Sequence, residues 1–449
     1  MRIVLFNLIY AVALVLLSPW LLWRYLFRGR YRRGWREKLL GTVSGTTSPR
    51  QQGATRIWLH AVSVGEVHLL QPLIGELQKR LPESTLYLST TTETGFDRAS
   101  ELFGSRHEVF FWPSDFSWAV KSSLARIDPD LVVLMELELW PNFLRICKAH
   151  NIPVVVANAR ISDKSFKGYQ RMSFLMGSAF GELSLVLAQN ETYAERFREL
   201  GVESRRVDVC GNIKFDSLMD SLDATRDDAA RLVSKAGFDP DHKLFVAGST
   251  QVEDERASAM AFAKASQSHD DLRLVIVPRH PDRRNEVLDV LAEQNLRGVL
   301  RSRLTEQAVD GAPFDATDPA NVLIVDLIGE LTMWWSRASV AFVGGSLGTR
   351  GGQNMIEPAA FGVPICFGPN TWNFRAEVEA LVVDDAARVI HNPDELESFV
   401  TRSVTDYDDA AAMGQRASEV VQQNQGATKR TVEQLVGLVP TSDDSKHRP

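Results

Sequence analysis

Two successive series of short apolar segments, alternating with stretches of helical periodicity, constrain the fold of this chain most strongly. A polar, charged stretch near 219–228 separates the two series. Such alternation predicts βαβ units and a mainly parallel sheet in each half. The predicted strands are 57–60, 85–90, 109–111, 131–134, 154–157, 185–188 and 207–209 in the first half, and 244–247, 272–277, 322–325, 340–343 and 364–366 in the second.

The length of the chain suits this two-part organisation. Its 449 residues are 44% hydrophobic and 24% charged, which is a globular composition with room for two domains of about 200 residues each. Ligands prefer the cleft between two such domains, so we expect one there. We predict a polar linker at 41–55, domains at 56–220 and 221–439, and a disordered tail at 440–449.

The N-terminus carries an apolar segment at 3–23, interrupted only by Asn7, Tyr10, Ser18 and Pro19. This is about the length that a helix needs to cross a bilayer. A basic run follows it within residues 24–38 and predicts that the rest of the chain is cytoplasmic.

We therefore predict a membrane anchor with a basic flank at 1–40. A cleaved signal peptide is the weaker interpretation, because the basic residues follow the apolar segment and no A-x-A site comes after it. Whether the helix spans the bilayer or lies in its interface stays open, because Pro19 could kink it. The basic residues would also contact anionic lipid head groups.

Composition narrows the function classes further. A net charge of -7 argues against a general nucleic-acid binder. The three cysteines, Cys147, Cys210 and Cys366, lie far apart, which suits a reducing compartment without disulfides. The nine histidines show no HxxxH or HExxH spacing, so we expect no metal site.

The segment 57–66 places a carboxylate where α/β sheets bind ligands. A short apolar strand breaks into a loop of small residues, and Gly65 and Glu66 then open a helical pattern. On position alone, Glu66 is slightly more consistent with a carboxylate that complements the positive end of its helix. A catalytic role depends on the rest of the chain.

A glycine-rich segment at 343–358 is the strongest motif of the second half. Five glycines between a buried strand and a helix expected near Asn354 allow a ligand to approach the backbone closely. The free N–H groups at such a helix start would bind phosphate, and Glu357 would accept hydrogen bonds from ribose hydroxyls. An ordinary flexible loop is the weaker interpretation.

Other loops carry weaker signals. Arg279 lies in a basic loop after the strand predicted at 272–277 and is placed to contact phosphate or a base, although an arginine often only solvates its loop. The segment 248–250 is a second, short candidate phosphate loop. The segment 326–331 would present backbone groups to a base, and an ordinary loop explains it about equally well.

In the first half, Glu136 and Glu138 follow a strand, and strand alternation would place both on one side. One of them would serve structure by pairing with Arg160. Near the domain boundary, Lys214 suits an anionic substrate or a developing negative charge. A plain surface lysine is the alternative.

These segments resemble one family, the 3-deoxy-D-manno-octulosonic acid (Kdo) transferases of Gram-negative bacteria, glycosyltransferase family 30. The resemblance runs in order over nearly the whole chain. It implies an α/β fold of the GT-B type, with two Rossmann-like domains facing across a cleft behind an N-terminal membrane-anchor helix. The matching segments are 60–66, 135–141, 211–216, 278–281 and 344–369.

The resemblance also implies substrates and residue roles. It implies CMP-Kdo as donor, with no separate cofactor, and a lipid A precursor (lipid IVA) as acceptor at the bacterial inner membrane, with the catalytic domains on the cytoplasmic side. Glu66 would be the general base, and Glu136 and Lys214 would stabilise the transition state. The chain departs from the family pattern at Gln353, where many members have histidine. The implied CMP contacts are Pro278, Arg279, Gly329, Glu330, Leu331, Asn354, Met355, Ile356 and Glu357.

The expected reaction is an inverting transfer in which Glu66 takes the proton of the acceptor hydroxyl. Two alternatives remain from the sequence. One is a different GT-B transferase, or an epimerase, that uses a UDP-sugar. The other is a non-catalytic, membrane-tethered sensor of nucleotide sugars, which would leave Glu66 without a role.

Overall fold

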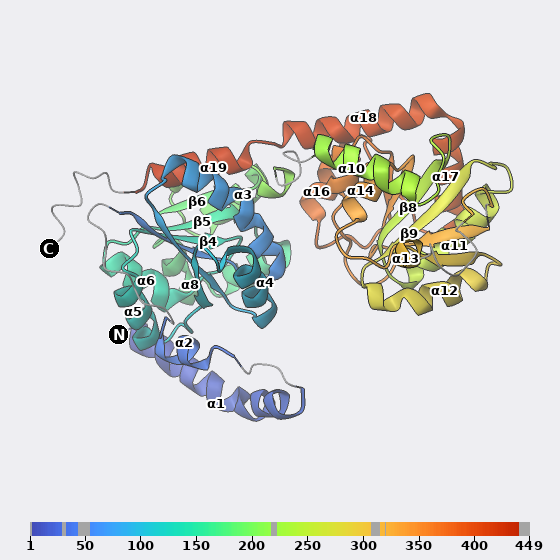
Figure 1. The fold of residues 1–449 in the computed structure, drawn as a ribbon. Coiled ribbons are helices and arrows are strands. Elements are labelled where there is room, and N and C mark those ends of the chain that lie inside the picture. Colours follow the sequence, from blue (N-terminus) through green and yellow to red (C-terminus); the bar gives the residue numbers. More distant parts are fainter. Residues whose placement is uncertain are drawn as a thin grey trace. The chain divides into compact units, whose positions relative to one another are not determined.

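The structure is a computed structural model, and it describes residues 2–28, 33–43, 54–216, 222–306, 315–318 and 320–439. The chain forms two compact units, the first comprising Met1–Ser217 and Gln425–Pro449 and the second Leu218–Asn424 (Figure 1). Most of the linker predicted at 41–55 and the whole tail predicted at 440–449 lie outside the described residues.

The first unit is built on a parallel sheet of seven strands in the order β3-β2-β1-β4-β5-β6-β7. Its strands are β1 (Arg56–His60), β2 (Thr85–Thr90), β3 (Glu108–Phe111), β4 (Leu131–Met135), β5 (Val154–Ala159), β6 (Leu185–Ala188) and β7 (Val207–Val209). Its helices are α1 (Arg2–Arg28), α2 (Trp35–Leu40), α3 (Val64–Arg80), α4 (Glu93–Phe103), α5 (Ser117–Ile127), α6 (Pro141–Ala149), α7 (Asp163–Arg171), α8 (Ser173–Phe180), α9 (Glu191–Glu199), the 3₁₀ turns η1 (Ser204–Arg206) and η2 (Ile213–Phe215), and α19 (Ala427–Val436).

The strands of this sheet are apolar throughout because both of its faces are covered. In β1, Ile57 and Leu59 belong to one buried cluster, and Trp58 between them belongs to another on the opposite face. Alternate residues of a strand point to opposite faces, so a strand buried on both sides appears as a continuous apolar run.

The second unit repeats this plan with the strand order β10-β11-β9-β8-β12-β13-β14. Its strands are β8 (Lys243–Thr250), β9 (Leu272–Pro278), β10 (Arg297–Leu300), β11 (Asn321–Ile324), β12 (Val340–Val343), β13 (Ile365–Phe367) and β14 (Arg388–Val389). Its helices are α10 (Leu222–Lys235), α11 (Val252–Ala265), η4 (Pro281–Arg283), α12 (Arg284–Ala292), α13 (Arg303–Glu306), α14 (Leu331–Trp335), α15 (Ile356–Ala360), α16 (Arg375–Val383), α17 (Pro393–Thr405) and α18 (Tyr407–Gln423).

Each sheet has one point at which the strand order reverses direction. In the first unit it lies between β1 and β4, and in the second between β8 and β12. Ligands of open α/β sheets bind outside the carboxyl ends of the strands at this point. A ligand site is therefore expected at the loops after β1, β4, β8 and β12.

The prediction of an α/β fold with two Rossmann-like domains is confirmed, with small differences in its elements. The sequence missed β10 and β14, and it placed the strand at 364–366 one residue early. The helix expected from Asn354 begins only at Ile356 and has five residues.

The domain predicted at 221–439 is wrong at its C-terminal end. Residues from Gln425 onward belong to the first unit, where α19 packs on α3. Ala427, Val432 and Leu435 of α19 lie in the same buried cluster as Ile57 of β1. The apolar face of α19 has the period of a helix but does not reveal which core it completes.

The apolar N-terminal segment forms the helix α1, as predicted. Residues Ile3–Trp20 have a mean hydropathy of 2.2, and only 6% of that stretch is buried in the protein. Length and composition therefore suit a membrane helix, although one such helix near an N-terminus is weak evidence.

Candidate active site

Glu66 lies at the first turn of α3, directly after the loop that leaves β1. Ser63 is the N-cap residue, and its hydroxyl donates a hydrogen bond of 3.0 Å to Oε1 of Glu66. The backbone N–H of Val62 donates one of 2.9 Å to Oε2. Both carboxylate oxygens are therefore held toward the loop, in a fixed orientation at the β1–β4 switch point.

The surroundings of Glu66 make its carboxyl group a weak acid. Burial is the largest cause and the charge of Glu136 the second, and together they raise the pKa of Glu66 to about 7. The hydrogen bonds from Val62 and Ser63 oppose this shift. A carboxylate with a pKa near neutrality is a better general base than an ordinary one, because it binds a proton more strongly.

Glu136 follows β4, on the other side of the same switch point. The strand ends at Met135, and Glu136 has a φ of 58°, in the left-handed region that non-glycine residues rarely adopt. Its backbone N–H still donates to the carbonyl of Ala157 in β5, at 2.9 Å. Both glutamates lie beyond the regular strand, so its alternation does not place them on one side. The prediction that it would was wrong.

The ion pair with Arg160 that was predicted for one of these two glutamates is formed by Glu136. Nε of Arg160 donates to Oε2 of Glu136 at 2.7 Å. Glu138 instead accepts a hydrogen bond of 3.0 Å from Nε1 of Trp140. Burial raises the pKa of Glu138 as well, and Glu136 adds to that shift.

Glu66, Glu136 and Glu138 thus form a cluster of three carboxylates that act on one another electrostatically. Within the described residues, no group of three or more His, Cys, Asp or Glu side chains is arranged to hold a metal ion. The charges of Glu136 and Glu138 add to the proton affinity of Glu66.

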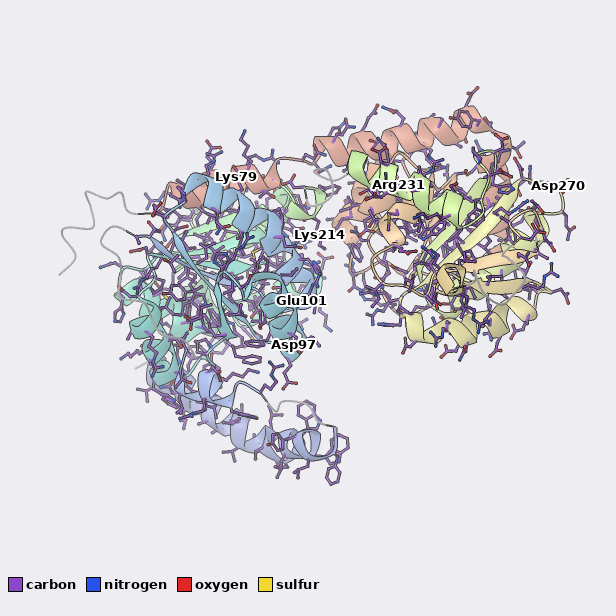
Figure 2. The ribbon with its side chains drawn as sticks, in the orientation of Figure 1. Lys79, Asp97, Glu101, Lys214, Arg231 and Asp270 are labelled. Carbon is purple, nitrogen blue, oxygen red and sulfur yellow. The ribbon has the colours of Figure 1, made fainter. Side chains whose placement is uncertain are left out.

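Lys214 lies in η2, on the surface of the first unit (Figure 2). The turn η2 packs against α3, the helix of Glu66. It is fixed by Asn158, whose Oδ1 accepts from the N–H of Ile213 at 3.0 Å. Asn158, like Glu136, has a positive φ, of 52°.

Asp216, two residues further on, has a role that the sequence did not reveal. Its carboxylate accepts hydrogen bonds from the N–H groups of Gly426 and Thr428, at 2.7 and 2.5 Å. It thereby caps the start of α19. The segment around Lys214 thus joins α3 to the C-terminal helix.

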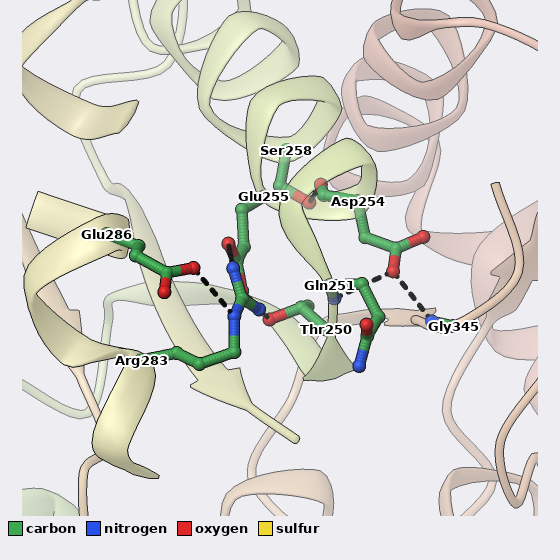
Figure 3. Close-up of polar contacts among 8 residues, drawn as sticks. All are labelled: Thr250, Gln251, Asp254, Glu255, Ser258, Arg283, Glu286 and Gly345. Carbon is green, nitrogen blue, oxygen red and sulfur yellow. Dashed lines mark hydrogen bonds and ion pairs between the residues drawn. The ribbon is translucent and has the colours of Figure 1, made fainter. Parts of the chain in front are cut away.

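In the second unit, the glycine-rich loop after β12 is tied to α11 by Asp254. Its Oδ2 accepts from the N–H groups of Gln251 and Gly345, at 2.9 and 2.7 Å (Figure 3). Its Oδ1 accepts from Ser346 and Leu347, at 3.4 and 3.1 Å. The N–H groups of Gly345, Ser346 and Leu347 therefore already have a carboxylate partner.

Two glycines of this loop are needed for its shape. Gly345 has a φ of 64°, in the left-handed region, while its N–H points to Asp254. Gly351 has a φ of 94°, and a Cβ there would lie 2.4 Å from Nε1 of Trp372. Any other residue at either position would strain or displace the loop.

A second buried network fixes the neighbouring loop, which carries Arg279. The guanidinium of Arg283 donates two hydrogen bonds, of 2.8 and 2.9 Å, to the buried Glu255 (Figure 3). Thr250 donates to Glu255 at 3.1 Å, and its carbonyl accepts from the N–H of Arg279. The segment 248–250 ends β8 and is not a free phosphate loop, contrary to expectation.

Arg279 itself is exposed, directly after Pro278, the last residue of β9. Its charge acts on Glu357, the second residue of α15. Burial raises the pKa of Glu357, and a hydrogen bond of 3.1 Å from Nδ2 of Asn354 opposes the shift. Met355 is the N-cap residue of α15, whose first residue is Ile356.

The loop after β11 contributes Gly329, Glu330 and Leu331 at the start of α14. Glu330 is held by an ion pair with Arg301, at 3.2 Å, and Gly329 has a φ of 94° with open space beside it. Of the nine predicted CMP contacts, Pro278 ends β9 and the other eight follow β9, β11 or β12, whose carboxyl ends lie at one edge of the parallel sheet.

Two Rossmann-like units, each with polar loops at its switch point, give this chain a fold of the GT-B type. A UDP-GlcNAc 2-epimerase from Neisseria meningitidis, solved with UDP-GlcNAc, shares this fold with a TM-score of 0.60. It is 16% identical, and the match covers 85% of this chain and 100% of that one. At this identity the likeness concerns the fold alone.

The family follows from the sequence relatives. Residues 33–217 match the model of the 3-deoxy-D-manno-octulosonic acid transferase (kdotransferase) family. Two proteins named 3-deoxy-D-manno-octulosonic acid transferase are similar over most of their length. The protein from Haemophilus influenzae is 31% identical, and the match covers 90% of this chain and 91% of that protein. The protein from Bordetella pertussis is 30% identical, and the match covers 95% of this chain and 98% of that protein.

This chain therefore belongs to the 3-deoxy-D-manno-octulosonic acid transferase family, and it is a glycosyltransferase.

Proposed function

We propose that this enzyme transfers Kdo from CMP-Kdo to a lipid A precursor at the cytoplasmic face of the inner membrane, with Glu66 as general base. The observation that carries the proposal is the oriented Glu66 carboxylate at the switch point of the first unit, with a pKa near 7. Membership of a family named for Kdo transfer supports the substrate.

The proposed step is an inverting displacement. A hydroxyl oxygen of the acceptor attacks the anomeric carbon of Kdo, while its proton passes to Glu66. The bond from that carbon to the phosphate oxygen of CMP breaks, and CMP leaves with the electron pair. Because the attacking oxygen becomes more nucleophilic as it loses its proton, a base of matched pKa lowers the barrier.

Lys214 and Glu136 would act around this step. The lysine would hold an anionic group, either the Kdo carboxylate or a lipid phosphate. Glu136, held by Arg160 at 2.7 Å, keeps the proton affinity of Glu66 high. Its charge is fixed in place by its ion pair, so it does not need to touch the substrate for this effect.

The second unit would bind CMP through the loops that carry the predicted contacts. Arg279 is exposed and positively charged, which suits a phosphate. The N–H groups of Gly345, Ser346 and Leu347 donate to Asp254. We therefore place the phosphate against Arg279 and the start of α15 rather than in the first turn of the glycine-rich loop.

Incubation with CMP-Kdo and a lipid A precursor, followed by mass spectrometry of the lipid, tests the function. We expect one or more Kdo masses on the lipid with the wild-type enzyme and none with Glu66→Gln, while calorimetry shows CMP binding in both. Glu76→Gln is the matched control. Glu76 lies on the same helix, and within the described part of the chain its ion pairs are with Lys79 and Arg80. Near-normal turnover by Glu66→Gln would disprove the base assignment.

A UDP-sugar enzyme is the alternative, and competition binding separates it. We expect CMP to displace a labelled cytidine nucleotide at a concentration at which UDP does not. The reverse preference would reject CMP-Kdo as the donor.

A further inference from the structure

The apolar helix α1 is attached to the first unit near its start. Phe6 is 3% exposed, and Ile3 packs against the buried cluster that contains Trp58 and Phe143. The guanidinium of Arg145 in α6 lies over the Phe6 ring, at 5.0 Å. One face of the first turns of α1 therefore packs on protein.

The two polar residues in this part of α1 complete the contact. Nδ2 of Asn7 donates to the hydroxyl of Ser117, at 2.8 Å, and Oδ1 accepts from the N–H of Ser117 and from Nδ2 of Asn142. The hydroxyl of Tyr10 donates to the buried Asp115 at 2.8 Å. Polar groups in hydrocarbon need such partners, and these partners are supplied by the loop before α5 and by the starts of α5 and α6.

The chain after α1 returns to the same unit. Arg33 pairs with Asp97 of α4, its backbone N–H donates to Glu93 at 3.1 Å, and its guanidinium lies over the Phe96 ring. From Tyr10 to Arg28 the helix is about 27 Å long at 1.5 Å per residue. The chain from Arg28 to Arg33 reaches at most about 18 Å.

These lengths decide the orientation of the helix. If α1 ran straight away from the unit after Tyr10, its end would be too far away for Arg33 to reach α4. Crossing a hydrocarbon core of about 30 Å with both ends fixed to one side is therefore impossible. The end of the helix must therefore stay near the first unit, at whose edge α1 lies (Figure 1).

The outer face of α1 is strongly apolar. Val15 and Leu16 are 70% and 74% exposed, and the exposed Trp20 and Trp23 are residues that favour the membrane interface. Arg36 of the following helix α2 is exposed beside an exposed Trp35. An apolar face bordered by tryptophans and basic residues matches a bilayer with anionic head groups.

We propose that α1 is an in-plane membrane helix, docked to the first unit through Phe6, Asn7 and Tyr10, with its opposite face in phospholipid. The inference rests on the membrane location proposed above and adds that the N-terminus lies on the same side as the catalytic units. An in-plane α1 would hold the first unit at a fixed distance from the membrane surface in which the lipid acceptor lies.

Protease protection of terminal epitope tags tests the topology in the full chain, without any need for catalysis. We expect tags at both ends to be cleaved in inverted inner-membrane vesicles and both to be protected in intact spheroplasts. Cleavage of the N-terminal tag in spheroplasts would show a spanning helix and overturn the inference. Kdo transfer is assayed separately, so the two proposals fail independently.

Two variants test the two faces of α1. The double variant Asn7→Leu, Tyr10→Phe should still float with phosphatidylglycerol vesicles but should have a lower unfolding temperature. The control Val12→Leu, on the outer face, should leave the unfolding temperature unchanged. Val12→Glu with Leu16→Glu should lose flotation and stay folded. Unchanged stability in the first case, or unchanged flotation in the second, contradicts the docked arrangement, as would a wild-type protein that does not float with the vesicles.

Discussion

Glu66 in the first unit and Asp254 in the second occupy equivalent positions. Each is the third residue of the helix that follows the strand on one side of the switch point, β1 and β8 respectively. Burial raises the pKa of both. Yet Asp254 accepts four backbone hydrogen bonds, whereas Glu66 accepts one backbone bond and one hydroxyl bond.

The number of donors explains how one position serves two purposes. Four N–H groups use up the acceptor capacity of Asp254, so its carboxylate fixes a loop. The two donors on Glu66 orient the group and leave lone pairs for a substrate proton, while neighbouring carboxylates increase its proton affinity. The same local sequence signal, an acidic residue at a helix start, therefore predicts neither role by itself.

The largest expected effect separates the two carboxylates by kinetics. Glu66→Gln should lower kcat by about 10²- to 10⁴-fold with little change in CMP affinity, because only the base is lost. Asp254→Asn should instead weaken CMP binding and leave the chemical step at saturation largely intact. Steady-state kinetics and calorimetry on both variants check this, and a kcat loss of similar size for both would remove the distinction.

The second effect concerns stability. Asp254→Asn removes charge-assisted acceptors for loop N–H groups in a buried position, so we expect the second unit to lose on the order of 3 kcal/mol. Thermal unfolding should show this loss. Glu253→Gln on the same first turn of α11 is the control, and an equal loss there would point to the helix dipole rather than to the loop.

For Glu66→Gln we expect a smaller change in the free energy of unfolding, and the variant should be more stable than the wild type rather than less stable. The pKa of Glu66 rises from 4.5 unfolded to about 7 folded, so the folded state favours the neutral carboxyl. Its contribution to stability is fully present below pH 4.5 and is lost as the pH rises toward 7. At pH 8 the neutral Gln should therefore stabilise the protein by about 1 to 2 kcal/mol, an advantage that should vanish at pH 4.5.

The smallest effect is a shift of the pH profile. In the wild-type enzyme, kcat/KM should rise with pH through an apparent pKa of about 7, as Glu66 loses its proton. Glu136→Gln removes the larger neighbouring charge and should move this limb to lower pH. Glu138→Gln should move it less, since Glu138 is the smallest cause of the shift. An unmoved limb in Glu136→Gln would exclude this coupling.

Much of the fold could be predicted from sequence because buried parallel strands are continuous apolar runs. Strands such as β2 (Thr85–Thr90) and β6 (Leu185–Ala188) were predicted at their observed bounds. The two residues of β14 were missed because so short a strand has no detectable period. The assignment of α19 failed because helical periodicity does not identify the partner that covers its apolar face.

The candidate site was only partly predictable, for a similar reason. Glu66 stands out locally, at the junction of a strand and a helix. The left-handed backbone of Glu136 and the contact of Asp254 with a loop more than 90 residues later depend on tertiary structure. The signal around Asp254 was a capping box, Gln251 with Asp254, which predicts a helix start but not a tie to another loop.

The position of α19 has a consequence for synthesis. The second unit is inserted, along the chain, between α3 and the helix that covers α3. A ribosome therefore completes the whole second unit before it makes the last piece of the first. Until α19 arrives and Asp216 caps its start, the helix that bears Glu66 lacks part of its apolar cover. A chain interrupted near residue 424 would carry Glu66, Glu136 and Lys214, the residues proposed to act in catalysis, and still lack part of the core that α3 helps to form.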